Sequence, residues 1–251
     1  MQGISRWKDK VALVTGASAG IGETVAHGLA AAGMTVAIAG RRASPLEAVA
    51  RDIREAGGNA VAFTCDIGSE SDVLGMFERI RGSIGPLDVL INNAGVGYQS
   101  SISEAATADW RSVLDVNVLG TSICIREALK QTAHRPDTAI STISSQAAHR
   151  IPAGGYSYYA ASKHALRAVM EGLRMELVAA GSPTKVGSIS PGTVATDFHR
   201  LFARSDVDPT AALDFQRLLP QDIADAVLYM LSTPSHVQIN DILIRPVGQL
   251  G

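Results

Sequence analysis

The segment that decides the fold is VALVTGASAGIG, residues 11–22, in which a short apolar run leads into a glycine-rich turn. The turn, Thr15–Gly22, has the spacing GxxxGxG, whereas the common dinucleotide fingerprint is GxGxxG. Both spacings let the turn tighten and let a pyrophosphate approach the backbone. A helix expected to begin near Ile21 would then direct its N-terminal amides at the anion. Such a turn can also simply join a strand to a helix, so the surrounding pattern must decide.

Around this turn, short apolar runs alternate with helical patterns along the whole chain. The runs predicted to be strands are 11–15, 35–39, 60–64, 89–92, 138–143, 186–189 and 242–245. They are apolar throughout rather than alternating, which is typical of a parallel sheet buried on both faces. We therefore predict an α/β fold, a doubly wound, Rossmann-like and mostly seven-stranded parallel sheet with helices on both faces.

Helices are predicted between these strands, at about 69–83, 107–132, 157–180 and 220–231. Another is predicted to start at Ser44-Pro45-Leu46-Glu47. There Ser44 would cap the helix, Pro45 suits the first turn, and Glu47 would complete a capping box. Gly57 and Gly58 would end this helix.

The length of 251 residues allows one large domain or two small ones. No repeat, low-complexity stretch or linker divides the chain, so we predict a single domain over residues 1–251. The least patterned stretch, about 196–219, is predicted to be a substrate-loop insertion acting as a lid or binding loop. A small pair of surface helices is the alternative.

Composition excludes several classes of protein. A formal net charge of -2 gives no electrostatic case for nucleic acid or an anionic membrane as a partner. The hydrophobic share of 46% argues against disorder. Cys65 and Cys124 are the only cysteines and do not form a CxxC pair, so we expect no metal site and no disulfide framework. The first ten residues contain no apolar signal-peptide core, and we expect a soluble cytoplasmic protein.

The end of the second predicted strand indicates which cofactor the glycine turn would hold. In NAD-binding folds an acidic residue about 20 positions further on binds the ribose hydroxyls. Here Gly40 is followed by Arg41 and Arg42, with no carboxylate. Two guanidinium groups suit a 2′-phosphate, so the sequence predicts NADP(H) rather than NAD(H). A pair of solvated surface arginines is the alternative.

Tyr159 and Lys163 are four residues apart, so on a helix both would lie on one face, about one turn apart. A tyrosine ionises near pH ~10 and is therefore an acid at neutral pH. A nearby ammonium favours the phenolate, so the pair could pass a proton to a carbonyl oxygen. Without context the YxxxK spacing is a weak signal, because both residue types are common.

Seven motifs in one order supply that context. They are Thr15–Gly22, Asp66, Asn92-Asn93-Ala94-Gly95, Asn117 within Asp115-Val116-Asn117-Val118, Ser144-Ser145, Tyr159 with Lys163, and Pro191-Gly192 with Thr196. In this order and spacing the chain resembles the short-chain dehydrogenase/reductase family, in its Rossmann-fold branch of about this chain's length. The resemblance covers essentially residues 10–249.

The resemblance implies four catalytic residues, Asn117, Ser145, Tyr159 and Lys163. Tyr159 would be the general acid/base, while Lys163 would hold the nicotinamide ribose and lower the pKa of the tyrosine. Ser145 would hydrogen-bond the substrate oxygen, although Ser144 competes for this role. Asn117 would bend its helix and anchor a water molecule next to the lysine.

The resemblance also implies how NADP(H) would be bound. Asp66 would accept a hydrogen bond from the adenine amino group, Ile67 would pack beside the ring, and Val194 and Thr196 would meet the nicotinamide carboxamide. Asp66 could instead cap a helix. The expected cofactor-binding residues are Gly16, Ser18, Ala19, Gly20, Ile21, Gly22, Arg41, Arg42, Asp66, Ile67, Asn93, Ala94, Gly95, Tyr159, Lys163, Pro191, Gly192, Val194 and Thr196.

The activity implied is hydride transfer between NADP(H) and a small ketone, aldehyde or secondary alcohol, by a carbonyl reductase (ketoreductase) or alcohol dehydrogenase. Alternatives are a serine-type 3-hydroxy acid dehydrogenase, a 3-oxoacyl-carrier-protein reductase, and a regulator that binds NADP(H) without turnover. Residues 240–246 lack the paired glycines usual in the oxoacyl reductases, and an intact catalytic set argues against the regulator. The expected substrate contacts are Ser145, Gln146, Ala147, Tyr159, Tyr98, Phe198 and Phe202.

Three further side chains lie near the expected pocket. Arg150 and Arg200 could reach its rim, and His149 is interpreted as a plain loop histidine in preference to a substrate contact. Family members are usually dimers or tetramers that pack two helices against a symmetry mate. The apolar faces of 107–132 and 157–180 are compatible with a homo-oligomer, a tetramer or a dimer, although a monomer could pack them on its sheet.

Overall fold

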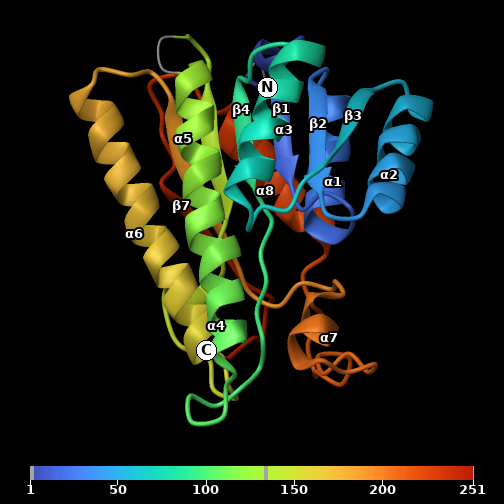
Figure 1. The fold of residues 1–251 in the computed structure, drawn as a ribbon, viewed down its shortest axis with the longest axis vertical. Coiled ribbons are helices and arrows are strands. Elements are labelled where there is room, and N and C mark those ends of the chain that lie inside the picture. The colour runs from blue at the N-terminus through green and yellow to red at the C-terminus, as the bar shows by residue number, and fades with distance from the viewer. Residues whose placement is uncertain (1–2, 133–134, 251) are drawn as a thin grey trace.

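The computed structural model describes residues 3–132 and 135–250, and in it seven strands form one sheet (Figure 1). The strand order is β3-β2-β1-β4-β5-β6-β7, and every neighbouring pair is parallel. The strands are β1 Val11–Thr15, β2 Thr35–Gly40, β3 Asn59–Thr64, β4 Val89–Asn92, β5 Ala139–Ile143, β6 Lys185–Pro191 and β7 Asp241–Ile244. The predicted doubly wound parallel sheet is confirmed.

Helices cover both faces of this sheet (Figure 1). The helices of the described residues are η1 Ile4–Trp7, α1 Gly20–Ala31, α2 Ala43–Glu55, α3 Glu70–Ser83, α4 Thr107–Leu114, η2 Asp115–Gly120, α5 Thr121–Thr132, η3 Gln146–Ala148, α6 Ser157–Ala179, α7 Phe198–Ala203 and α8 Pro220–Ser232. Along β1, Ala12 and Val14 pack into a core cluster with α1, α2 and α8, whereas Val11 and Leu13 pack into a second cluster with α3, α5 and α6. Because both faces are covered, the strand is apolar throughout. None of the helices among the described residues is long and apolar enough to cross a membrane.

Two predicted helix boundaries are wrong. Helix α2 begins at Ala43, so Ser44 lies inside its first turn and does not cap it. The residue before the helix is Arg42, which has an extended backbone and makes no side-chain cap. The predicted single helix 107–132 is interrupted by η2, a π-helical turn between α4 and α5. Gly57, by contrast, ends α2 as predicted, with a φ of +85°.

The stretch 196–219 contains one short helix, α7, followed by an irregular segment (Figure 1). Its far end returns to the sheet, where Leu218 forms a parallel bridge with Val194 beyond β6. Phe202 of α7 is 2% exposed and packs against Tyr159 and Ala160 of α6. The described part of this stretch therefore forms one helix rather than the alternative pair, and it covers the carboxyl edge of the sheet.

Candidate active site

A cavity of about 1000 Å³ opens at the carboxyl edge of the sheet. Ligands of open parallel α/β sheets bind at this edge, where the strand order reverses. The cavity extends from the glycine turn after β1 to helix α7. All of the predicted cofactor-binding residues line it except Gly22.

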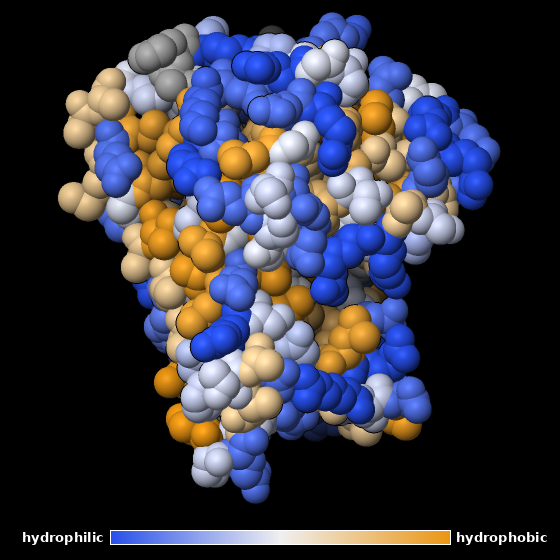
Figure 2. All heavy atoms as spheres, in the orientation of Figure 1, coloured by the Kyte–Doolittle hydropathy of each residue, from blue (hydrophilic) through white to orange (hydrophobic). Residues whose placement is uncertain are grey.

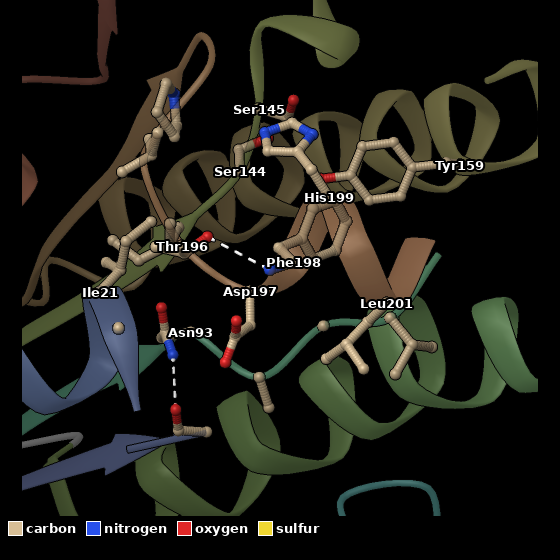
Figure 3. Close-up of a pocket in the computed structure, with 18 of the residues that line it drawn as sticks. Ile21, Asn93, Ser144, Ser145, Tyr159, Thr196, Asp197, Phe198, His199 and Leu201 are labelled. Atoms are coloured by element: carbon tan, nitrogen blue, oxygen red, sulfur yellow. Dashed lines mark hydrogen bonds between the residues drawn. The ribbon is translucent and has the colours of Figure 1, made fainter. Parts of the chain in front are cut away.

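The glycine turn is held in a shape that only glycine allows at its first position. Gly16 has a φ of +66°, and a Cβ there would lie 2.8 Å from the Cα of Ala94. Asn93 fixes the turn, because its side-chain amide donates hydrogen bonds to the carbonyl oxygens of Thr15 and Gly16, one of which Figure 3 draws. A Cβ on Gly22 would lie 2.4 Å from this same amide nitrogen. Gly22 is thus needed for close packing of the turn against Asn93, and it does not line the cavity.

Helix α1 presents its N-terminus to the cavity. It begins at Gly20, and the preceding Ala19 provides no side-chain cap. The first amides of a helix have no partner inside the helix, and the helix dipole favours negative charge there. Ser18, Ala19 and Ile21 line the cavity at this point. The turn therefore has the geometry of a phosphate-binding site.

Two arginines and one aspartate lie at the same end of the cavity. Arg41 and Arg42 are both exposed and line it, and Arg42 donates a hydrogen bond of 3.3 Å to the hydroxyl of Ser18. Asp66 also lines the cavity, and its Oδ1 accepts the backbone N–H of Gly68 at 3.0 Å. Asp66 thus makes the local bond expected of a turn residue while still facing the cavity.

The predicted proton-transfer residues meet at the other end. Ser145 follows β5, and Tyr159 and Lys163 face the cavity from α6. Figure 3 shows Tyr159 and Ser145 with Phe198 of α7 beside them, and the Tyr159 and Phe198 rings are 5.5 Å apart. Ser145 hydrogen-bonds the Tyr159 side chain. A phenol and a hydroxyl that share one cavity wall can both reach a single carbonyl oxygen.

Burial sets the pKa values of this pair. Burial raises the pKa of Tyr159 to about 12, although the hydrogen bond from Ser145 acts in the opposite direction. Burial lowers the pKa of Lys163 to about 8, and its Nζ donates to the carbonyl of Ile143 at 3.1 Å. The expected lowering of the tyrosine pKa by Lys163 is therefore not found in the protein alone. The ammonium lies 5.7 Å from the centre of the tyrosine ring, and desolvation dominates.

Asn117 lies behind the cavity rather than in its wall. Its Oδ1 accepts the N–H of Val96 at 2.8 Å, and its Nδ2 donates to the Val96 carbonyl at 2.8 Å and to the Ser162 hydroxyl at 3.0 Å. Asn117 occupies the π-helical turn η2, in agreement with the predicted bend. A Cβ on Gly95 would lie 3.4 Å from Asn117 Oδ1 and 3.7 Å from Lys163 Nζ, so the two side chains flank this glycine.

The structure separates the two competing serines. Both line the cavity, but Ser145 is the one that hydrogen-bonds Tyr159 and also accepts the N–H of Ala147 at 3.1 Å. The Ser144 hydroxyl is buried and has no hydrogen-bond partner among the described residues. Of the two serines, Ser145 is therefore the one that contacts the tyrosine side chain.

The expected substrate contacts divide into two groups. Gln146 and Phe198 line the cavity, as Ser145 and Tyr159 do. Tyr98, Ala147 and Phe202 do not, contrary to expectation. Ala147 is 1% exposed inside the fold, and Phe202 is buried behind the wall, where it stacks on Tyr156 at 4.4 Å. The ring of Tyr98 packs instead against the guanidinium group of Arg204, whose Cζ lies 4.5 Å from the ring centre.

Of the three further side chains expected near the pocket, the two arginines line the cavity and the histidine does not. The Nε2 of His149 lies 2.9 Å from Asp241 Oδ2 and 3.2 Å from the Ser190 hydroxyl, outside the cavity lining, which agrees with a loop histidine. Arg150 and Arg200 both line the cavity.

The lining residues that sequence reasoning missed include Pro152, Ala153, Tyr156 and Gln249. Gln249 reaches the cavity because the C-terminal segment folds back, so that its side-chain amide accepts the N–H of Thr193 and donates to the Thr193 hydroxyl, each at 3.1 Å. The two residues are 56 positions apart, so no local pattern could reveal this contact. Pro152, Ala153 and Tyr156 precede the tyrosine of the YxxxK pair and could have been included on proximity alone.

A family model described as short chain dehydrogenase matches residues 10–205. The chain belongs to the short-chain dehydrogenase/reductase family. It is 40% identical over 257 residues to dehydrogenase/reductase SDR family member 11 of Homo sapiens, an alignment that covers 99% of this chain and 98% of that protein. It is 39% identical over 250 residues to farnesol dehydrogenase of Aedes aegypti, covering 98% and 99%.

The fold of this short-chain dehydrogenase/reductase is also found among solved structures. The closed form of serine dehydrogenase complexed with NADP+ superposes with a TM-score of 0.87 at 28% identity and covers 96% of both chains. The chain is therefore a member of an oxidoreductase family with a Rossmann-like fold.

Proposed function

We propose that this protein is an NADP(H)-dependent carbonyl reductase or alcohol dehydrogenase that acts on a small ketone, aldehyde or secondary alcohol. The observation that carries the proposal is one cavity with a phosphate-binding turn at one end and Ser145, Tyr159 and Lys163 at the other. Its similarity to a farnesol dehydrogenase and to a serine dehydrogenase complexed with NADP+ supports the same reaction class.

The cavity fits the proposed cofactor at its glycine turn and at its arginines. A side chain at Gly16 would meet Ala94, so the backbone can approach a pyrophosphate only with glycine there. The uncapped N-terminus of α1 suits the phosphates, and Arg41 and Arg42 suit a 2′-phosphate. When bound, NADPH supplies the hydride.

The proton would come from Tyr159. With a pKa of about 12 the phenol is protonated at neutral pH, so in carbonyl reduction it would act as the general acid. The Ser145 hydroxyl orients the phenol and donates to the same substrate oxygen. Lys163, with a pKa of about 8, carries a proton near neutral pH directly behind this pair. Asn117 holds Val96 and Ser162 in place around them.

The cavity also suits an apolar substrate. Tyr156, Phe198 and Leu201 line it together with Val96 and Pro152. Apolar walls with a few placed polar groups are typical of small-molecule sites. We therefore expect an apolar or moderately polar carbonyl compound rather than a highly charged one.

The reaction is tested by following NADPH oxidation with a panel of ketones, aldehydes, oxoacids and oxoacyl thioesters. We expect turnover of at least one ketone or aldehyde, and a loss of about 10²–10⁴-fold in kcat in Tyr159→Phe with NADPH binding retained. Tyr158→Phe is the matched control, because Tyr158 is the neighbouring residue on α6 and stacks on Trp110 outside the cavity. Binding of NADPH without turnover of any carbonyl would refute the proposed enzymatic activity and favour a regulator that binds NADP(H).

Cofactor choice has its own test. The double variant Arg41→Ala with Arg42→Ala should raise the Kd of NADPH about 10- to 100-fold while changing that of NADH little, since charged hydrogen bonds contribute about 1.5–3 kcal/mol. Arg51→Ala, an exposed arginine of α2 outside the cavity lining, is the control. Equal weakening of NADPH and NADH would contradict the role of the two arginines.

We further propose that the chain assembles into a homo-oligomer, a dimer or a tetramer. Figure 2 shows apolar residues gathered where α5 and α6 lie. Leu119 of η2 is 55% exposed, and Met175 and Val178 of α6 are 60% and 67% exposed. Light scattering should give a mass of at least two chains, and a monomer at micromolar concentration would contradict the proposal.

A further inference from the structure

One polar side chain stands out in the apolar part of the cavity. His199, on α7, lines the cavity, and its Nδ1 is buried without a hydrogen-bond partner among the described residues. Figure 3 shows the imidazole directed into the cavity, on the side where the hydroxyl groups of Ser145 and Tyr159 lie. An imidazole nitrogen that is buried and unpaired is unfavourable by about 1–3 kcal/mol, so its place in the cavity lining calls for an explanation.

The surroundings of His199 set the kind of partner it can take. The ring of Phe198 lies edge-on to the imidazole at 5.7 Å, and Leu201 lines the same wall. Burial lowers the pKa of His199, while Asp208 and Arg217 act in opposite directions and form an ion pair with each other. At neutral pH the imidazole is therefore uncharged, with one nitrogen a donor and the other an acceptor. Such a group matches a hydroxyl or a carbonyl better than a carboxylate.

We propose that His199 is a specificity-determining residue that hydrogen-bonds a second, uncharged oxygen of the substrate close to the reacting carbonyl. The enzyme would then prefer hydroxy ketones, in which the hydroxyl is on the first or second carbon from the carbonyl, over simple ketones of the same size. The inference rests on the proposed function, since it requires a carbonyl bound at Ser145 and Tyr159.

The nearest alternative for substrate recognition is Arg150. Its guanidinium lines the cavity and donates to Gln146 Oε1 at 3.3 Å, while its Nε is buried without a partner among the described residues. An arginine would favour a carboxylate, whereas the neutral imidazole favours an uncharged oxygen. The two chemistries can be separated by choice of substrate.

The test compares ketones that differ only by exchange of a methyl for a hydroxyl group. The pairs are 2-hydroxyacetophenone with propiophenone and 3-hydroxypropiophenone with butyrophenone, reduced with NADPH. In at least one pair we expect kcat/KM to be about 10- to 100-fold higher for the hydroxy ketone, mainly through KM, because a simple ketone leaves the buried nitrogen unpaired.

Variants assign this preference to the histidine. His199→Leu should bring the ratio of kcat/KM within the pair to about one, and His199→Gln should retain part of it because an amide can still hydrogen-bond. His236→Leu is the matched control, since this histidine is exposed beyond α8 and outside the cavity lining, and it should leave the ratio unchanged. Because each ratio is taken within one variant, a general loss of folded protein cancels.

Different failures have different meanings. Equal turnover of both members of both pairs by the wild-type protein would overturn the inference and leave the proposed function standing. A preference that survives His199→Leu would also overturn it, as would a stronger preference for benzoylformate that depends on Arg150. Absence of any carbonyl turnover would overturn the proposed function and the inference with it.

Discussion

Lys163 should destabilise the fold at neutral pH. The side chain is 4% exposed, and Nζ donates to the carbonyl of Ile143. Burial lowers its pKa from 10.5 to about 8. The unfolded chain therefore binds this proton more tightly than the folded protein, so stability is reduced below pH 8 and recovers as the pH rises from about 8 to 10.5. The difference between the two pKa values corresponds to about 3 kcal/mol at pH 7.

The variant Lys163→Met removes the buried charge and keeps a long apolar chain. It also removes the hydrogen bond to Ile143, which contributes about 1 kcal/mol. At about pH 7 we expect the free energy of unfolding to rise by about 2 kcal/mol relative to wild type, and at about pH 9.5 by close to zero. Catalytic activity should be lost at both pH values.

The assay is urea denaturation followed by circular dichroism on nucleotide-free protein at the two pH values. Groups that titrate in both proteins cancel in the difference between variant and wild type. Lys8→Met, at an exposed lysine, should show no pH-dependent difference. A Lys163→Met protein that is less stable than wild type at pH 7, or a difference that does not change with pH, would refute the reasoning.

Two further predictions concern the glycine turn and the support of the site. Gly16→Ala places a methyl group 2.8 Å from a backbone carbon at positive φ, so it should weaken NADPH binding at least about 10-fold and lower stability by about 1–3 kcal/mol, as seen by fluorescence titration and urea denaturation. Gly82→Ala, on α3 with no atom within 4 Å of the new carbon, should instead raise stability by about 0.5–1 kcal/mol and leave binding unchanged; equal effects of the two would contradict the argument. Asn117→Ala leaves both backbone groups of Val96 and the Ser162 hydroxyl without this partner, so it should lower stability by about 2–4 kcal/mol, whereas Ser162→Ala should lower it by about 1 kcal/mol. Similar losses in the two variants would show that the Val96 bonds contribute little.

Local pattern predicted most of the elements. The apolar runs became strands because a strand buried on both faces has no polar side, and β1 and β4 have the predicted bounds. Ser44 misled the prediction because Arg42, which already has an extended backbone after β2, takes the N-cap position two residues earlier. The division of 107–132 could not be predicted from helical periodicity. It accompanies bonds between Asn117 and Val96, which are 21 positions apart.

In the candidate site, too, local sequence predicted some features and tertiary packing decided the others. Spacing brought Tyr159 and Lys163 to one helix face, and motif order marked Ser145 and the glycine turn. The exclusion of Tyr98 and Phe202 from the cavity wall depends on their packing against Arg204 and Tyr156, which no sequence window contains.

The sequence by itself determined the alternation of strands and helices, the turn that approaches a phosphate, and the set of residues able to move a proton, because these depend on neighbours a few positions apart. Tertiary structure alone decided the state of those residues. Burial by distant elements raises the pKa of Tyr159 and lowers that of Lys163, and desolvation depends on everything that surrounds a group. The same holds for His199, whose buried nitrogen becomes informative only once α7 forms part of the cavity that Ser145 and Tyr159 also line.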